Sequence, residues 1–214
     1  MNSDNMVISK GNLKKGQLKD KIALITGAGG GIGYEAARAL IWLGAKVIIA
    51  EIDIVKGKRA MDELNRVFGV NCAVFCHTDI GSEKSVKKLA KNVFNTFGHI
   101  DILFNNATVA PIGPVHEVGI KEWDLSYGVN LRGPVLLISQ FLPYMLRRNS
   151  GIIAMVPSSG AAPFMGAYEV FKTAQVELAN TLAAELENTD IITYSIGPGI
   201  VKTDTALKSI EKLA

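Results

Sequence analysis

A tyrosine and a lysine four residues apart form the pair in this sequence that is best suited to move a proton. Tyr168 and Lys172 fall in an amphipathic segment, where a spacing of four places two side chains on one face of a helix. A phenol is a poor base at its usual pKa of about 10, but a neighbouring ammonium favours the phenolate. Proton transfer near neutral pH then becomes feasible, although the same spacing is also common on ordinary helix surfaces.

A glycine-rich turn is the second motif with clear chemistry. The apolar run at residues 22–25 leads into residues 26–33, where glycines are concentrated, and a helical pattern follows. Backbone without side chains can approach a pyrophosphate closely, and the N-terminus of the next helix supplies free N–H groups. Flexible turns also use glycine, but the flanking strand and helix favour phosphate binding. The candidate ligands are Gly27, Gly29, Gly30, Gly31, Ile32 and Gly33.

Acidic residues follow the next two predicted strands. Glu51 lies eighteen residues after Gly33, where a carboxylate accepts hydrogen bonds from the adenosine ribose and repels a 2′-phosphate. This position favours NAD(H) over NADP(H) as the cofactor. Asp53 is better placed to cap the next helix. Asp79 could accept a hydrogen bond from the adenine amino group, with helix capping as its alternative role.

The elements that must position these residues alternate along the chain. Short apolar runs predict strands at residues 21–26, 46–51, 71–77, 100–105, 151–157 and 190–196. Longer amphipathic runs predict helices at residues 32–43, 54–68, 82–97, 120–147 and 164–187. Ser82 and Gly98 fit as the cap and stop of the third helix, and Pro143 should end or kink the fourth. This alternation predicts an α/β fold with a doubly wound parallel sheet, whose ligand crevice lies beyond the carboxyl ends of the strands.

Six motifs in order resemble those of the short-chain dehydrogenase/reductase family. The resemblance extends from about residue 18 to residue 205 and is carried by Thr26-Gly27…Gly31-Ile32-Gly33, Asn105-Asn106-Ala107, Asn130, Ser158, Tyr168 with Lys172, and Pro198-Gly199. It implies a Rossmann fold with the strand order 3-2-1-4-5-6. It also implies hydride transfer between nicotinamide and an alcohol or carbonyl substrate.

The resemblance implies a role for each catalytic candidate. Tyr168 would be the acid/base, and Lys172 would hold the nicotinamide ribose and lower the tyrosine pKa. Ser158 would hydrogen-bond the substrate oxygen. Asn130 would hold a water that links Lys172 to solvent.

The resemblance also implies further cofactor contacts. The turn with Asn105 and Ala107 would steady the sheet beside the cofactor. The segment with Pro198, Gly199, Ile200 and Thr203 would line the nicotinamide, with Ile200 and Thr203 near its carboxamide.

The sequence departs from the family pattern near the catalytic serine. Ser158 lies ten residues before Tyr168, a shorter spacing than is usual between the catalytic serine and tyrosine of the family. The shortening falls within residues 160–162, and Ser159 is an alternative catalytic serine. Thr108 stands where the family usually has glycine after Asn-Asn-Ala, and a turn tolerates it only with a negative φ.

The region after the sixth strand is the larger departure. Family members usually continue with a substrate-covering segment, a helix and a seventh strand. Residues 203–214 could begin the covering segment, but the seventh strand has no candidate. The sixth strand would then be a sheet edge. The alternative function is therefore a dinucleotide-binding protein with weak or no catalysis.

Composition excludes several other classes. The net charge of +3 is too small to indicate a nucleic-acid partner, and no apolar run is long enough to span a membrane. Cys72 and Cys76 lie too far apart on a strand for a disulfide, and no metal site is predicted. We expect a cytoplasmic protein with a flexible leader at residues 1–17 and one domain at residues 18–214. The resemblance implies a homodimer or homotetramer.

Overall fold

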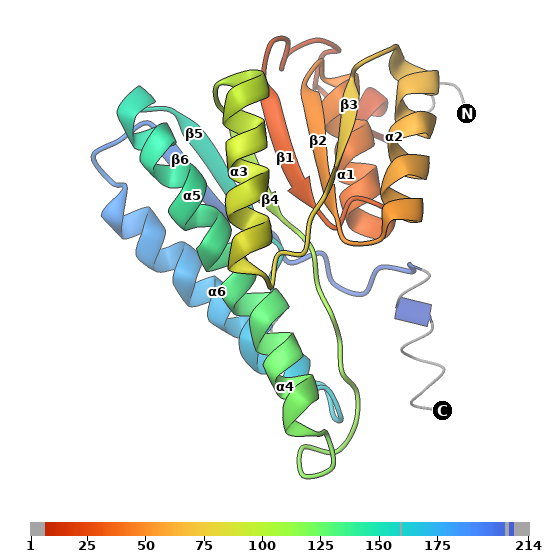
Figure 1. Ribbon diagram of the computed structural model, residues 1–214, viewed down its shortest axis with the longest axis vertical. Coiled ribbons are helices and arrows are strands. Elements are labelled where there is room, and N and C mark those ends of the chain that lie inside the picture. The colour runs from red at the N-terminus through yellow and green to blue at the C-terminus, as the bar shows by residue number, and fades with distance from the viewer. Residues whose placement is uncertain (1–6, 159, 204–205, 208–214) are drawn as a thin grey trace.

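The chain folds into a parallel sheet with helices on both faces (Figure 1). The computed structural model describes residues 7–158, 160–203 and 206–207. Its six strands pair in the order β3-β2-β1-β4-β5-β6, and every pair is parallel. The predicted fold class and strand order are confirmed.

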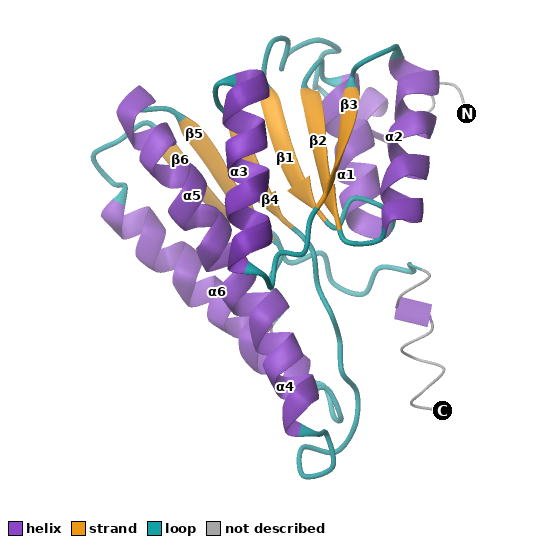
Figure 2. Ribbon diagram, viewed as in Figure 1, coloured by secondary structure: helices purple, strands orange, loops and turns teal. Residues whose placement is uncertain are grey.

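The strands are short and the helices that connect them are long (Figure 2). The strands are β1 (Ile22–Thr26), β2 (Lys46–Glu51), β3 (Ala73–His77), β4 (Ile102–Asn105), β5 (Gly151–Met155) and β6 (Ile191–Ser195). The helices are α1 (Gly31–Trp42), α2 (Ile54–Phe68), α3 (Glu83–Phe97), α4 (Ile120–Tyr127), α5 (Gly133–Arg148) and α6 (Gly166–Glu185). A short 3-10 helix, η2 (Val7–Lys10), precedes β1, and a π-helical turn, η3 (Gly128–Arg132), joins α4 to α5.

The sheet divides the apolar core into two layers. Alternate side chains of a strand point to opposite faces, so Leu24 of β1 packs into the cluster formed with α3, α5 and α6. Its neighbours Ala23 and Ile25 pack into the cluster formed with α1 and α2. Because both faces of the central strands are covered, their sequences are continuously apolar.

The predicted helix caps are confirmed. Asp53 precedes α2, and its side chain accepts hydrogen bonds from the Val55 and Lys56 N–H groups. Ser82 caps α3 through the Ser85 N–H, and Gly98 ends that helix with φ +75°.

The single helix predicted at residues 120–147 is wrong. The π-helical turn η3 separates α4 from α5, and α5 continues past Pro143 to Arg148. Pro143 does not end the helix because it lies on the exposed side. Proline has no N–H to donate to the Ser139 carbonyl four residues earlier, but Ser139 is exposed, so water can hydrogen-bond this carbonyl instead.

β6 is the edge of the sheet within the described residues, as predicted. Ile192 and Tyr194 are each 49% exposed on the face opposite α6, whereas Thr193 Oγ1 on the other face donates to the Ala179 carbonyl. This end of the sheet therefore presents apolar side chains to solvent.

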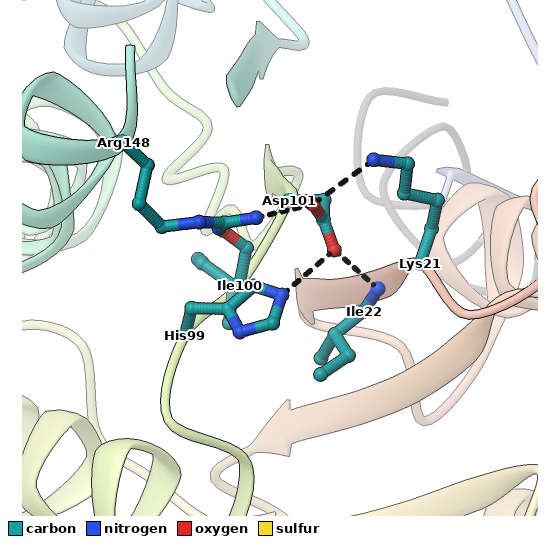
Figure 3. Close-up of polar contacts among 6 residues, drawn as sticks. All are labelled: Lys21, Ile22, His99, Ile100, Asp101 and Arg148. Atoms are coloured by element: carbon teal, nitrogen blue, oxygen red, sulfur yellow. Dashed lines mark hydrogen bonds and ion pairs between the residues drawn. The ribbon is translucent and has the colours of Figure 1, made fainter. Parts of the chain in front are cut away.

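A buried carboxylate ties the amino ends of β1 and β4 to the end of α5 (Figure 3). Asp101 Oδ1 accepts from Lys21 Nζ at 3.3 Å and Arg148 Nη2 at 3.1 Å. Asp101 Oδ2 accepts from the Ile22 N–H at 2.9 Å and lies 3.4 Å from His99 Nε2. Burial acts to raise the pKa of Asp101, but these hydrogen bonds and the Lys21 charge outweigh it, and the net pKa is lowered.

Outside the sheet, the structure adds three observations. Ile8 of the predicted leader packs against the cluster of Trp42 and Leu43. Cys72 and Cys76 are half-buried free thiols, and burial raises the pKa of each. None of the described helices has the length and apolar character needed to cross a membrane.

Candidate active site

Most of the predicted site residues belong to segments that follow the carboxyl ends of the strands. Figure 1 shows these segments along one edge of the sheet. The carboxyl ends of parallel strands meet at one edge, so the turns that follow them come close together. Strand ends and turns carry Gly27, Gly29, Gly30, Glu51, Asp79, Asn105, Ala107, Ser158, Pro198, Gly199, Ile200 and Thr203. Helical segments carry Gly31, Ile32, Gly33, Asn130, Tyr168 and Lys172. Ser159 lies outside the described residues.

The glycine-rich turn is too tight for side chains at several positions. Gly27 and Gly31 have φ values of +66° and +55°, which favour glycine. A Cβ atom on Gly33 would lie 2.5 Å from Asn106 Nδ2 and 2.6 Å from the Gly27 carbonyl oxygen. The residue at the N-cap of α1 is Gly30, which has no side chain to cap the helix. The turn therefore presents bare backbone and a helix N-terminus, as phosphate binding requires.

Glu51 is held beside this turn by three backbone donors. Its Oε2 accepts from the Gly29 N–H at 3.0 Å, and its Oε1 accepts from the N–H groups of Ile52 and Asp53 at 2.9 and 3.1 Å. A carboxylate has about four acceptor positions, so further hydrogen bonds to a ligand are possible. Asp53 caps α2 with its own side chain, which leaves Glu51 as the carboxylate of this loop that faces the glycine turn.

Asp79 makes a local turn after β3. Its Oδ1 accepts from the Gly81 N–H at 2.9 Å, and its backbone N–H donates to Ser85 Oγ. These contacts form a turn just before α3, whose cap is Ser82, and the adenine contact stays a prediction.

Thr26 links the glycine-rich turn to the turn after β4. Its buried hydroxyl accepts from the N–H groups of Asn106 and Ala107, each at 3.0 Å. Asn106 Nδ2 donates back to the carbonyls of Thr26 and Gly27. Asn105 is buried, and within the described residues its Oδ1 has no hydrogen-bond partner.

The Tyr168 hydroxyl belongs to a chain of polar side chains. Burial raises its pKa, and so does the Glu169 carboxylate, whereas hydrogen bonds with Ser158 and Thr108 lower it; the net pKa is raised. Lowering of this pKa by Lys172 stays a prediction. Thr108 does not have a positive φ, so the turn tolerates threonine in place of the usual glycine.

Asn130 is fully buried in the π-helical turn and connects three segments. Its Oδ1 accepts from Thr108 Oγ1 at 2.8 Å and from the Val109 N–H at 3.1 Å. Its Nδ2 donates to the Val109 carbonyl at 2.7 Å and to Ser126 Oγ at 2.8 Å. Its backbone carbonyl accepts from Gln175 Nε2. The side chain thus orders the loop that carries Thr108, and the predicted water relay stays a prediction.

Lys172 lies on the same face of α6 as Tyr168 and is 2% exposed. Burial lowers its pKa to about 8, and the Glu169 carboxylate acts in the opposite direction. The Lys172 amine therefore binds its proton less tightly than the amine of a surface lysine does.

The segment after β6 crosses to the glycine-rich turn. A Cβ atom on Gly31 would lie 3.3 Å from Thr203 Cγ2, so Thr203 reaches the start of α1. Ile200 is 96% exposed, and its predicted contact with the carboxamide stays a prediction.

Two buried polar residues of α6 were missed by sequence reasoning. Glu169 follows Tyr168 directly, and Gln175 lies seven residues after Tyr168 and three after Lys172. The helical spacing of residues 168, 172 and 175 places them on one face and could have drawn attention to Gln175. Glu169 offers no such periodic signal.

The fold and site define a Rossmann-type nucleotide-binding protein. The chain belongs to the short-chain dehydrogenase/reductase family of oxidoreductases, because the family pattern described as short chain dehydrogenase matches residues 21–214. An uncharacterized oxidoreductase from Thermotoga maritima is 34% identical over 199 residues, which cover 91% of this chain and 77% of that protein. The predicted family is confirmed.

Solved structures give the same result. A 3-ketoacyl-(acyl-carrier-protein) reductase from Brucella melitensis, complexed with NADH, has a TM-score of 0.81 and 30% identity, covering 89% of this chain and 79% of its own. A metagenomic short-chain oxidoreductase in complex with NADP has a TM-score of 0.81 and 29% identity, covering 92% of this chain and 91% of its own.

Proposed function

We propose that this chain is an NAD(H)-dependent oxidoreductase that transfers a hydride between nicotinamide and an alcohol or carbonyl substrate. The observation that carries the proposal is the placement of Tyr168 near the Ser158 and Thr108 hydroxyls, on the same face of α6 as the buried Lys172. Membership in a family of oxidoreductases supports this reaction class.

The glycine-rich turn fits a dinucleotide. Gly33 has no space for a side chain, whereas a Cβ atom on Gly30 would meet no atom within 4 Å. The uncapped N-terminus of α1 would bind the pyrophosphate through its free N–H groups. The NADH and NADP in the two similar structures support a nicotinamide dinucleotide here.

Glu51 supports NAD(H) as the preferred form. Three backbone N–H groups fix its carboxylate beside the glycine-rich turn, where the adenosine ribose would lie. Ribose hydroxyls can donate to this carboxylate, while a 2′-phosphate would be repelled by it.

The proposed mechanism gives Tyr168 the proton transfer. When bound, the nicotinamide supplies or accepts the hydride. Tyr168 donates its phenolic proton to the substrate oxygen in reduction and accepts the hydroxyl proton in oxidation. Ser158 hydrogen-bonds the same oxygen after its hydroxyl proton turns from Glu169 to the substrate, and Lys172 holds positive charge near the phenol. Thr108, which donates to Asn130 Oδ1, lies near the tyrosine hydroxyl.

A panel of secondary alcohols with NAD⁺ and of ketones with NADH tests the proposal by the absorbance of the reduced cofactor. We expect turnover of at least one apolar substrate, because the loop at residues 109–115 is largely apolar. NADH binding without turnover across the panel would favour the noncatalytic alternative.

The cellular setting completes the proposal. Cytoplasmic location and assembly into a homodimer or homotetramer stay predictions. Exposed apolar side chains on α4, α5 and α6 support assembly through these helices: Leu125, Tyr127, Val135, Tyr144, Leu146 and Val170.

A further inference from the structure

Glu169 connects the start of α6 to the loop that follows β5. Its Oε1 accepts from Ser158 Oγ at 3.0 Å, and its Oε2 accepts from the Gly160 N–H at 3.1 Å. The residue is only 9% exposed. Both carboxylate oxygens are therefore used to hold the segment that carries the candidate catalytic serine.

A second hydrogen bond fixes the same segment. Thr173 Oγ1 of α6 donates to the Ser158 carbonyl at 3.0 Å. Ser158 is thus attached to α6 through its side chain by Glu169 and through its backbone by Thr173. These contacts hold the short loop between Ser158 and Tyr168 against the helix.

Glu169 also brings a negative charge close to the proton-transfer groups. The titratable groups that the structure places under its influence are Tyr168 and Lys172, both on α6. From the loop after β5 it meets the neutral Ser158 hydroxyl and Gly160 N–H, and from the loop after β4 the neutral Thr108 hydroxyl faces Tyr168. Because Glu169 is buried, water screens its charge only weakly.

We propose that Glu169 is a positioning residue of the candidate active site, whose carboxylate orients the Ser158 hydroxyl, ties the short loop to α6 and places negative charge beside Tyr168 and Lys172. The proposal rests on the proposed function for the reaction that it would serve. Its structural and electrostatic parts can be measured without turnover.

The first test measures how the charge of Glu169 affects the pKa of Tyr168. NMR of ring-labelled tyrosine follows the titration of Tyr168, assigned by its absence in Tyr168→Phe. Removing the charge in Glu169→Gln should move the Tyr168 midpoint to lower pH, because the carboxylate raises that pKa. Glu177→Gln, an exposed position on the same helix, should leave the midpoint unchanged. A midpoint in Glu169→Gln equal to that of the unmodified chain would overturn the electrostatic part.

The second test measures positioning. In Glu169→Ala the Gly160 amide loses its acceptor, so its hydrogen exchange should accelerate, while Glu177→Ala should not change it. In Glu169→Gln the amide oxygen can still accept from Gly160 and the amide NH2 can donate to Ser158, so exchange should stay closer to that of the unmodified chain. Unchanged Gly160 exchange in a folded Glu169→Ala protein, checked by its melting temperature, would contradict the positioning role.

Kinetics then connect the residue to the reaction. With any substrate that is turned over, Glu169→Ala should lower kcat/KM by about tenfold to a hundredfold through misplacement of Ser158, with partial rescue by Glu169→Gln. Wild-type kcat/KM in Glu169→Ala would overturn the role in catalysis. Absence of turnover in the unmodified chain would instead count against the proposed function, and the NMR results would still decide the role of Glu169 in the site.

Discussion

At the scale of single residues, two carboxylates lie beside different parts of the candidate site. Glu51 lies beside the glycine-rich turn, whereas Glu169 lies beside Tyr168 and Lys172. One carboxylate would therefore face the adenosine end of a dinucleotide and the other the reacting end. Each can be neutralised without removing the other.

Neutralising Glu51 should weaken discrimination against NADPH. In Glu51→Gln the repulsion of a 2′-phosphate is lost, and the ratio of NADPH to NADH affinity should rise about tenfold, as expected for one close charge contact partly screened by water. Fluorescence titrations with both cofactors measure the ratio, and Glu177→Gln serves as the control. An unchanged ratio of affinities would mean that Glu51 does not discriminate between NADH and NADPH.

The motifs predicted which residues belong to the site, but their contacts were not predictable. Glycine spacing and the tyrosine–lysine spacing are local patterns that a sequence displays directly. The bonds from Glu169 to Ser158 and from Gln175 to the Asn130 carbonyl depend on how α6 packs against other elements. The raised net pKa of Tyr168 likewise results from burial, which the spacing of residues 168 and 172 does not reveal.

At the scale of elements, β1 and β4 are joined through one hydroxyl. Thr26 ends β1, and its buried side chain accepts from the N–H groups of Asn106 and Ala107 after β4. The glycine-rich turn and the Asn105–Ala107 turn are therefore held in one arrangement.

Thr26→Val should destabilise the protein at this junction. Valine keeps the shape but removes the acceptor, which leaves two backbone N–H groups unpaired and should cost about 1–3 kcal/mol in the free energy of unfolding. Urea unfolding measures the change. Thr181→Val, at an exposed position of α6, is the matched control. A loss no larger than that of the control would show that the two turns do not depend on this hydroxyl.

Strands and capped helices were predictable because their signals are local. The alternation of apolar runs predicted all six strands, and Asp53 and Ser82 marked two helix starts. The π-helical turn has a local signal that the helical periodicity of residues 120–147 hides. Pro134, at the start of α5, has no N–H to donate to the Asn130 carbonyl four residues earlier, and Gln175 Nε2 donates to that carbonyl in its place.

At the scale of the whole molecule, the candidate site and the Asp101 contacts lie at opposite ends of the strands. The site occupies the carboxyl ends, while Asp101 joins the amino ends of β1 and β4 to Arg148 of α5 (Figure 3). Stability contributed by Asp101 should therefore be separable from ligand binding at the site.

Asp101→Asn should lower stability in a pH-dependent way. The folded pKa of Asp101 lies below that of an unfolded aspartate, about 3.9, so its contribution is complete above that pH and is lost as the pH falls through the folded pKa. The variant should lose about 2 kcal/mol at neutral pH, and the difference should shrink toward pH ~3. Urea unfolding across this range tests both expectations, and an equal difference at every pH would contradict the charge argument. NADH affinity should stay unchanged.

The central claim is that Tyr168 transfers the proton in a nicotinamide-dependent reaction, and Tyr168→Phe tests it most directly. The variant removes one hydroxyl oxygen, so we expect NADH binding close to that of the unmodified chain and a loss in kcat/KM of at least about a hundredfold, the usual effect of removing a general acid or base. Measuring both quantities on one protein preparation separates binding from chemistry. Turnover by Tyr168→Phe equal to that of the unmodified chain would contradict the account.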